Sequence, residues 1–330
     1  MQEYKISVII PVGNGAIYLG EVLNALSQQT QKPFELVIVD DRVADSSLKP
    51  VQKTELPIKL IKTTEDRYGV SSARNIGAEN ARGDVIVFID SDVILNPDAL
   101  YRIAKSIKHY DGVIGVQSKD CGFNNISSRY KNQWMRWTYI RLKSPVSLFY
   151  TSFAVIKREL FIKTGGFDEM YKSPSIEDTA FGNKLSSLGF KIHIDKQLEY
   201  IHKRRYNLID ILKTDFGRSR DLTYYFLKNI NVRKKFKTSV PIKTFVVLPI
   251  AIIGVCYISV FVFTGIKILA ILGFSLLTFI PIIYIDFIKH ISIEDGCKTA
   301  LLSSVIIIFD MFISSIGAVA GLFKRFLKTS

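Results

Sequence analysis

Residues 69–92 read GVSSARNIGAENARGDVIVFIDSD and give the clearest indication of the fold. Within this stretch, the run DVIVFID at 84–90 is continuously apolar and rich in β-branched residues, so it predicts a buried strand. The strand ends on Asp90-Ser91-Asp92, and alternation along a strand points Asp90 and Asp92 the same way. We therefore expect two carboxylates side by side at the end of a buried strand.

The segments before this strand show the same alternation of strands and helices. Apolar runs at 6–12 (ISVIIPV) and 34–40 (FELVIVD) predict two buried strands, and 58–64 (IKLIKTT) predicts a weaker third. Helices are expected over 19–26, where leucine and valine repeat at helical spacing, and over 70–80. Continuous apolar strands joined by helices indicate an α/β fold with a mostly parallel sheet covered on both faces.

Four carboxylates fall at the carboxyl ends of the predicted strands, where ligands bind in sheets of this kind. They are Asp40, Asp41, Asp90 and Asp92. Carboxylates gathered at one edge would repel one another unless a bound cation offset their charge. Carboxylate oxygens are ligands that Mg²⁺ and Mn²⁺ prefer. We therefore expect a divalent metal that bridges a diphosphate. The alternative is a solvated turn, since Asp and Ser are common turn formers.

Composition separates the chain into two parts. Of its 330 residues 48% are hydrophobic, and the apolar residues concentrate after residue 240. The formal net charge of +14 predicts an anionic partner, and the basic residues cluster just before the apolar tail. This placement favours a membrane surface and no nucleic acid. Three widely spaced cysteines without a CxxC pair indicate neither a disulfide framework nor a zinc site.

The apolar tail contains three candidate membrane segments, at 244–266, 268–285 and 299–323. A spanning helix needs about 20 apolar residues, so the first and third qualify and the second is marginal. Residues 228–243 carry six basic residues and no acidic one, which predicts a cytoplasmic side before the first span. Because the first apolar run of the chain is too short for a signal peptide, we expect a multi-pass protein of the cell membrane with a cytoplasmic catalytic part.

The C-terminal charges conflict with three crossings. Lys324, Arg325 and Lys328 favour the cytoplasm, but a third span would place them outside. Either the second or the third segment is re-entrant or interfacial, or the charge rule fails here. Asp310, within the third segment, is costly in lipid and is expected to face protein or water.

Five blocks of sequence together resemble family 2 glycosyltransferases. They are ISVIIPVGN near the N-terminus, LVIVDDRVADSS at 36–47, residues 69–92, GGFDE at 165–169 and Glu177-Asp178, in the order typical of that family. The resemblance covers about residues 5–205. It implies an A-type glycosyltransferase fold, a nucleotide-sugar donor (a UDP-sugar by default) and Mn²⁺ or Mg²⁺ as cofactor. The expected organisation is a catalytic domain at 1–205, a basic interfacial linker at 206–243 and a membrane anchor at 244–330.

The resemblance also implies roles for individual residues. Nucleotide-sugar contacts are implied for Pro11, Val12, Asp41, Arg74, Asp90 and Ser91, and metal ligation for Asp92, Asp90 and His202. Asp92 would bind the metal directly, whereas Asp90 would contact ribose or metal-bound water. Each assignment has a structural alternative. Arg74 could pair with Glu79 on a helix surface, Asp41 could cap a turn, and His202 could be a surface histidine.

Glu177-Asp178 matches the pair that supplies the catalytic base in inverting members of the family. Asp178 would deprotonate the acceptor hydroxyl, and Glu177 would orient or bind the acceptor. With a phosphate as acceptor, no base would be needed and Asp178 would only position it. The alternative is an acidic pair that complements the dipole at a helix start.

Arg218 and Arg220 lie where processive synthases of this family carry Gln-x-x-Arg-Trp. That motif is absent, which argues against processive synthesis. The two arginines are candidate phosphate contacts, and they also suit an interfacial basic helix. The implied reaction is therefore metal-dependent, inverting and non-processive transfer of one sugar to a membrane-associated, lipid-linked acceptor.

Two loops depart from the family pattern. Residues 11–15 read Pro-Val-Gly-Asn-Gly where Pro-x-Tyr-Asn-Glu is usual, and Arg42-Val43 replaces Gly-Ser, so the substrate contacts of both loops are open. The main rival is a catalytically silent membrane scaffold with the same fold, although the retained acidic pairs argue against it. A dinucleotide-binding dehydrogenase is disfavoured because Tyr18 stands where the third fingerprint glycine belongs. A nucleotidyltransferase is disfavoured because no glycine- and basic-rich triphosphate loop follows the first strand.

Overall fold

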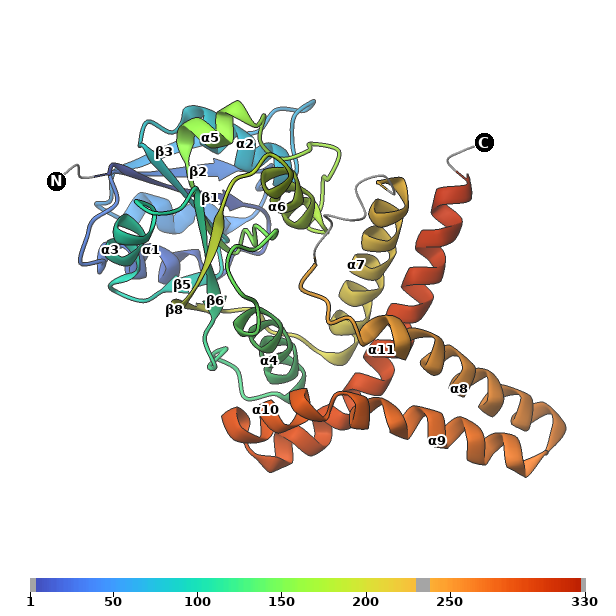
Figure 1. Cartoon of the computed structure of the whole chain (residues 1–330). Helices are drawn as coiled ribbons and strands as arrows, with labels where there is room; N and C mark the ends of the chain where they lie inside the picture. Colours follow the sequence, from blue (N-terminus) through green and yellow to red (C-terminus); the bar gives the residue numbers. More distant parts are fainter. Residues whose placement is uncertain (1–3, 230–237, 328–330) are drawn as a thin grey trace. The chain divides into compact units, whose positions relative to one another are not determined.

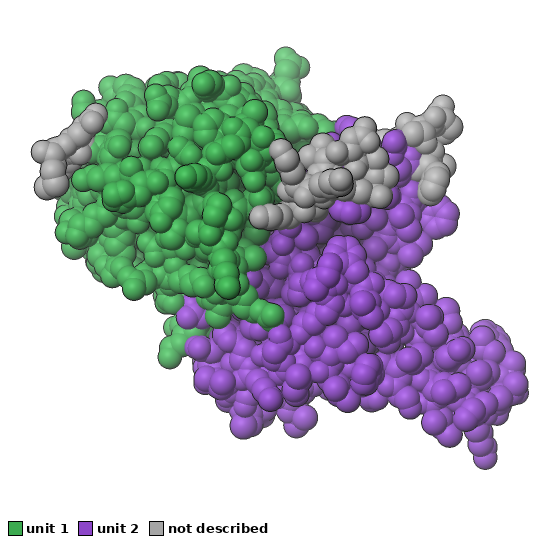
Figure 2. All heavy atoms as spheres, in the orientation of Figure 1, with its two compact units in different colours: residues 1–122, 139–204 green, residues 123–138, 205–330 purple. Residues whose placement is uncertain are grey.

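The computed structural model of the protein describes residues 4–229 and 238–327 (Figure 1). The chain divides into two compact units (Figure 2). The first unit comprises residues 1–122 and 139–204, and the second comprises residues 123–138 and 205–330. Part of the basic segment expected at 228–243 lies outside the described residues, and the division into catalytic domain, linker and anchor stays a prediction.

The first unit is built on one sheet of eight strands. They are β1 (Ile6–Val12), β2 (Glu35–Asp40), β3 (Ile58–Lys62), β4 (Val85–Ile89), β5 (Val93–Leu95), β6 (Gly112–Gln117), β7 (Phe153–Lys157) and β8 (Ile192–His202), in the order β3-β2-β1-β4-β7-β6-β8-β5. Strands β3, β2, β1 and β4 are parallel, β7 is antiparallel to both of its neighbours, and β5 is antiparallel to β8. The predicted mostly parallel α/β sheet is confirmed.

Helices α1 (Leu19–Ser27), α2 (Val70–Asn80), α3 (Ala99–Ser106), α5 (Arg158–Lys163) and α6 (Glu177–Ser187), with the 3₁₀ segment η1 (Ser46–Lys53), accompany this sheet. Every residue of β4 is buried between β1 and β7, as its unbroken apolar run predicts. Close packing of α2 on β1 depends on Gly77, because a Cβ there would lie 2.4 Å from Cγ2 of Ile9. This contact fixes the helix that carries Arg74.

One expectation about the strands is wrong. The sequences KIHID at 191–195 and LEYIHK at 198–203 predict two short strands, but Ile192–His202 form the single strand β8. The register of β8 against β6 shifts between Ile114 and Val116, so an irregularity in the ladder replaces the expected break. The continuous strand carries His202 to the edge where β5 begins.

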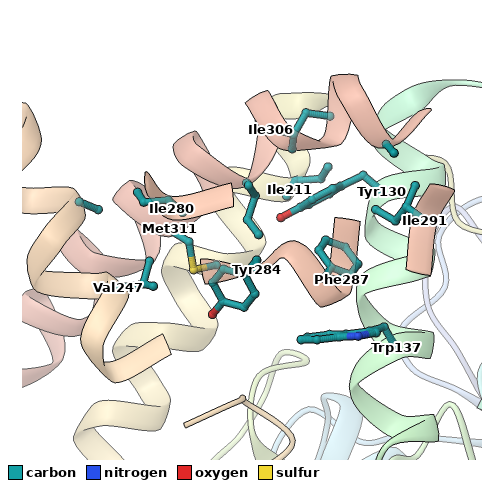
Figure 3. Close-up of a cluster of buried hydrophobic side chains, with 13 residues drawn as sticks. Tyr130, Trp137, Ile211, Val247, Ile280, Tyr284, Phe287, Ile291, Ile306 and Met311 are labelled. Atoms are coloured by element: carbon teal, nitrogen blue, oxygen red, sulfur yellow. The ribbon is translucent and has the colours of Figure 1, made fainter. Parts of the chain in front are cut away.

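The second unit is helical. It contains most of α4 (Ile126–Ile140), then α7 (Leu208–Lys228), α8 (Thr244–Thr264), α9 (Lys267–Ile283), α10 (Ile285–Asp295) and α11 (Cys297–Leu327). Its core includes Tyr130 and Trp137 of α4 packed with residues of the C-terminal helices, among them Tyr284 and Phe287 (Figure 3). The aromatic rings meet edge-on or tilted, for example Tyr130 and Phe287 with centroids 5.8 Å apart.

Two helices of this unit are long and apolar enough to cross a membrane, within Thr244–Thr264 and Cys297–Arg325. The second predicted segment is less regular than expected. It ends at Ile283 and bends by 58° into the unpredicted α10, so the pair could count as a third span by length and composition. The sequence prediction of two to three apolar membrane helices agrees with this range.

Candidate functional site

Strand ends of the first unit bring together the acidic motif and a histidine from 110 residues downstream. Asp90 and Asp92 follow β4, and Val93 at the start of β5 pairs with His202 at the end of β8. As a result, Nε2 of His202 lies 3.2 Å from Oδ1 of Asp92. The amide of Lys203 also donates to the backbone oxygen of Asp92 at 2.7 Å, which fixes the two segments against each other.

Asp90, Asp92 and His202 each offer one ligand atom, and these atoms lie within 4.8 Å of one another. Among the described residues it is the one group of three or more His, Cys, Asp or Glu side chains with such spacing. Two carboxylate oxygens and one imidazole nitrogen suit Mn²⁺ and are compatible with Mg²⁺. The structure therefore brings together the three residues for which metal ligation was predicted, and the donor set fits the cofactor.

Asp92 and His202 form an ion pair within this group. Burial alone would lower the pKa of His202, but the adjacent Asp92 carboxylate outweighs burial and raises it. Burial alone would raise the pKa of Asp92, and the His202 imidazole outweighs burial and lowers it. Both directions describe an ion pair that a bound cation would replace, because a metal-binding imidazole nitrogen must be unprotonated.

Gln117, at the end of β6, orients the other edge of the imidazole. Its Nε2 lies 3.2 Å from Nδ1 of His202 and 3.4 Å from the hydroxyl of Tyr150. A partner on the second ring nitrogen fixes the orientation and tautomer of a ligating histidine. Gln117 could not be identified from sequence, because residues 111–165 show no clear periodicity that would identify β6 or its end.

Arg74 lies buried between two of the predicted acidic residues. Its Nη2 lies 2.9 Å from Oδ1 of Asp90, and its Nη1 lies 2.9 Å from Oε1 of Glu177, with 3% of the Arg74 side chain and 4% of the Glu177 side chain exposed. Ser152 donates to the other oxygen of Asp90 at 2.8 Å. The guanidinium therefore holds Asp90 in one orientation beside Asp92.

The alternative pairing of Arg74 with Glu79 is wrong. Glu79 pairs with Arg67 instead, at 2.6 Å. Arg67 also binds Glu169 at 2.6 Å. The position of both residues in one predicted helix suggested the first pairing, but Arg74 binds Asp90 and Glu177 at the sheet edge, and Glu79 binds Arg67.

The segment GGFDE is fastened to α2 through its last residue. Glu169 accepts from Arg67 and from the side chains of Ser72 and Asn75, and Asn75 also exchanges hydrogen bonds with the backbone of Phe167. The Arg67 guanidinium lowers the pKa of Glu169 from 4.5 to about 2. This network sets the start of the segment that leads to Glu177.

Glu177 and Asp178 begin α6. Glu177 is held by Arg74 and by the amide of Ser175, which donates to Oε2 at 2.8 Å. Asp178 is partly exposed, and its Oδ1 accepts from the backbone and hydroxyl of Thr179. The helix-start interpretation is thus structurally correct, and it leaves the chemical roles of both residues as predictions.

The predicted nucleotide side of the site is formed by the ends of β1 and β2. Pro11 and Val12 pair with Val39 and Asp40, and the amide of Asp41 donates to Val12. Oδ1 of Asp41 accepts from the amide of Gly69 at 2.9 Å and from Thr63 at 3.1 Å. The turn after β2 is capped by Asp40, whose Oδ1 accepts from the amide of Val43 at 2.8 Å, whereas the contacts of Asp41 hold its carboxyl at the strand end.

Arg42 occupies a left-handed backbone conformation with φ of 62°. Its guanidinium lies 4.7 Å from the ring centroid of Tyr68, and Nζ of Lys172 lies 4.7 Å from the same centroid. The sequence leaves the substrate contacts of this loop open. Its exposed side chain stacks on Tyr68 at the mouth of the loop after β2.

The other candidate phosphate contacts, Arg218 and Arg220, lie on α7 in the second unit. Arg220 pairs with its neighbour Asp221 at 2.9 Å, and Arg218 approaches Sδ of Met135 at 3.8 Å. Their proposed contact with phosphate stays a prediction.

Residues 7–165 match the family model described as glycosyl transferase family 2. The chain is 27% identical over 209 residues to glycosyltransferase GlyA of Streptococcus pneumoniae, a match that covers 61% of this chain and 30% of GlyA. It is 28% identical over 208 residues to the poly(ribitol-phosphate) β-N-acetylglucosaminyltransferase TarS of Staphylococcus aureus, covering 61% of this chain and 36% of TarS. The matched region thus spans about a third of the length of these two relatives.

Two solved structures share the fold. The mannosyltransferase PcManGT of Pyrobaculum calidifontis, in complex with GDP-Man and Mn²⁺, superposes with a TM-score of 0.56 at 17% identity, covering 100% of this chain and 89% of PcManGT. TarS 1–349 of S. aureus, in complex with UDP-GlcNAc, gives 0.51 at 19% identity, covering 97% of this chain and 92% of that one. The A-type glycosyltransferase fold expected for the first unit is therefore confirmed.

Proposed function

The chain belongs to glycosyl transferase family 2, and from that premise we propose that it transfers one sugar from a nucleoside diphosphate donor to a membrane-associated acceptor. The observation that carries the proposal is the group of Asp90, Asp92 and His202 at the carboxyl edge of the sheet. A silent scaffold would have no need of three convergent metal ligands held by Arg74, Ser152 and Gln117.

The donor would lie across the ends of β1, β2 and β4. Pro11, Val12 and Asp41 would face the base and ribose, since Asp41 presents a fixed carboxyl at the strand end. Arg74, Asp90 and Ser91 would lie nearer the diphosphate and sugar. Relatives of this fold bind different bases, UDP-GlcNAc in TarS and GDP-Man in PcManGT, so a UDP-sugar is the first donor to test and a GDP-sugar the second.

Asp92, Asp90 and His202 would hold Mn²⁺ or Mg²⁺. A bound divalent cation supplies charge that stabilises a departing diphosphate. The chain's own residues prepare the site for it: Arg74 orients Asp90, and Gln117 orients His202. The fold of PcManGT carries Mn²⁺ in its solved complex, which supports the choice of metal.

Asp178 would act as the base that deprotonates the acceptor hydroxyl, which gives inversion at the transferred sugar. Glu177 is already bound by Arg74 and Ser175, so its role would be to couple α6 to the donor side rather than to take a proton. The absence of Gln-x-x-Arg-Trp near Arg218 supports transfer of a single sugar.

The acceptor would be a lipid-linked saccharide at the cytoplasmic face of the membrane. The apolar helix α8 and the basic residues before it support a membrane-attached protein with its first unit in the cytoplasm. Arg218 and Arg220 would contact an anionic group of the lipid or the diphosphate.

The test is transfer by the purified full-length chain from radiolabelled UDP- and GDP-sugars, with membrane lipid extract as acceptor. We expect one donor to label a lipid-soluble product with inverted anomeric configuration, and Asp178→Asn to reduce its formation at least 100-fold. Ser187→Ala, at the exposed end of α6, is the matched control and should retain activity. No labelled product from any donor would favour the silent scaffold.

A further inference from the structure

Helices α8 and α9 form an apolar hairpin whose two backbones touch. A Cβ on Gly273 would lie 2.7 Å from the backbone oxygen of Gly254, so only glycine permits this approach. Small residues at such contacts are typical of helix pairs in membranes. The outward side chains are apolar, and Phe263 near the tip is 88% exposed. With 21 residues, α8 is about 31 Å long, which matches a bilayer core of about 30 Å.

The base of the hairpin is fastened to the core of the helical unit. Nζ of Lys243 lies 4.5 Å from the ring centroid of Tyr284 and 5.2 Å from that of Trp137, and it pairs with Asp286. Both rings are buried in the core of this unit, so Lys243 fixes the start of α8 against that core. At the other end, the chain turns at Gly265 and Lys267 begins α9.

Helix α11 has a different environment, although it too is apolar enough in composition to cross a membrane. Of its most apolar stretch 44% is buried within the protein, compared with 17% for α8. Asp310 in its middle is 1% exposed and accepts from the hydroxyl of Tyr130 at 2.7 Å. Nearby, Lys131 of α4 pairs with Asp215 of α7 at 2.6 Å. A charged and hydrogen-bonded core therefore lies against this helix.

The C-terminal half of α11 is fastened along α7. Ser219 donates to the backbone oxygen of Ser314 at 2.6 Å, and Lys324 pairs with Asp221 at 3.2 Å. A Cβ on Gly317 or Gly321 would lie 2.4 Å from a backbone oxygen of α7, so the two helices are in backbone contact. If α11 crossed the membrane, α7 would have to lie at the same depth.

Helix α7 cannot lie in hydrocarbon. It carries seven charged residues in 21 positions: Asp210, Lys213, Asp215, Arg218, Arg220, Asp221 and Lys228. Each charge is costly at the bilayer centre. The outer face of α11, by contrast, is an apolar stripe at helical spacing, formed by Leu301, Val305, Phe309, Ile316, Val319 and Phe323. A helix with one face packed against polar parts of the protein and the other face apolar suits the membrane–water interface.

We propose that α8 and α9 each cross the lipid bilayer, while α11 lies in the membrane–water interface on the same side as α7. This arrangement places Lys324 and Arg325 on the same side as α7, and it removes the conflict that three crossings create with their charges. Figure 1 shows the hairpin leaving the helical unit while α11 continues beside α7.

The test is side-specific labelling of the full-length chain in sealed membrane vesicles with a membrane-impermeant maleimide. Single reporters are Lys228→Cys at the end of α7, Ile266→Cys at the hairpin turn and Arg325→Cys near the end of α11. Cys256 and Cys297 are changed to alanine, while Cys121 is buried and serves as the unlabelled background. We expect Lys228→Cys and Arg325→Cys to label from one side and Ile266→Cys from the other. Any other pattern, in particular Arg325→Cys labelling with Ile266→Cys, would overturn the proposal.

A second measurement does not depend on cysteine reactivity. Ile253 in α8 and Val305 in α11 are similarly exposed, at 45% and 52%. We expect Ile253→Lys to reduce the alkali-resistant membrane fraction several-fold, and Val305→Lys to leave it unchanged because an interfacial lysine reaches the headgroups. Equal losses in the two variants would contradict an interfacial α11.

Discussion

Arg74 binds Asp90 across 2.9 Å, and its second nitrogen binds Glu177 at the same distance, so one buried guanidinium joins the predicted donor motif to the predicted acceptor pair. Burial alone would lower the pKa of Arg74, but the two carboxylates outweigh it and raise the pKa, which keeps the group charged. The carboxylates of Asp90 and Glu177 therefore share one counter-charge.

Loss of this guanidinium should destabilise the first unit. Arg74→Met leaves Glu177 buried without its partner, and we expect the free energy of unfolding to fall by about 3–5 kcal/mol. Chemical denaturation in detergent measures the change. Arg102→Met, which removes an exposed pair with Asp98, is the control and should have little effect. Equal stability of Arg74→Met and wild type would show that the buried pairs are not formed.

Gln117 should affect metal binding without contacting the metal. Gln117→Leu removes the partner of His202 Nδ1, and we expect the affinity for Mn²⁺ to fall about 10–100-fold. Electron paramagnetic resonance of free Mn²⁺ measures this in the absence of donor. Gln197→Leu, at an exposed position of β8, is the control. An unchanged affinity in Gln117→Leu would mean that His202 is oriented by other contacts or does not bind the metal.

Glu169 should make the stability of the folded protein depend on pH. Its pKa is about 2 in the folded protein and 4.5 when unperturbed, so its pairing with Arg67 contributes fully above about pH 4.5 and is lost as the pH falls toward 2. Glu169→Gln should therefore be less stable than wild type at pH 7, and this difference should narrow at pH 3. Denaturation at both values measures it, with exposed Glu55→Gln as control. A constant difference would exclude this linkage.

Two helical glycines should respond oppositely to the same change. Gly77→Ala would place a Cβ 2.4 Å from Ile9, and we expect a loss of about 1–3 kcal/mol from overpacking. Gly217→Ala in α7 meets no atom within 4 Å and should stabilise its helix by about 0.5–1 kcal/mol. Thermal unfolding distinguishes the two. Similar effects would contradict the close packing of α2 on β1.

The fold was predictable where burial was complete. Strand β4 lies between two strands, so its apolar run and the acidic motif after it could be identified from sequence alone. The pairing of Val93 with His202 could not, since it depends on the register of an antiparallel edge pair far apart in sequence. The resemblance to a family supplied His202 instead.

Other features depend on tertiary contacts that sequence patterns do not report. Gln117 ends a strand in a region without clear periodicity. Arg74 pairs with Glu177 and not with Glu79 because of how α2 packs on the sheet. By hydropathy, α8 and α11 are both candidate membrane spans. Only the contacts of Asp310 and of the two glycines near the C-terminal end of α11 show that α11 packs against protein.

In the proposed reaction, a divalent metal held by Asp92 assists cleavage of the donor. The decisive measurement is the rate of nucleoside diphosphate release from the preferred donor across a Mn²⁺ series, for wild type, Asp92→Asn and Asp98→Asn. We predict release that rises with Mn²⁺, stops with EDTA, is reduced at least 100-fold in Asp92→Asn and is retained in Asp98→Asn, an exposed aspartate one strand further on. Undiminished release by Asp92→Asn, or release that persists in EDTA, would contradict a reaction that depends on a metal held by Asp92.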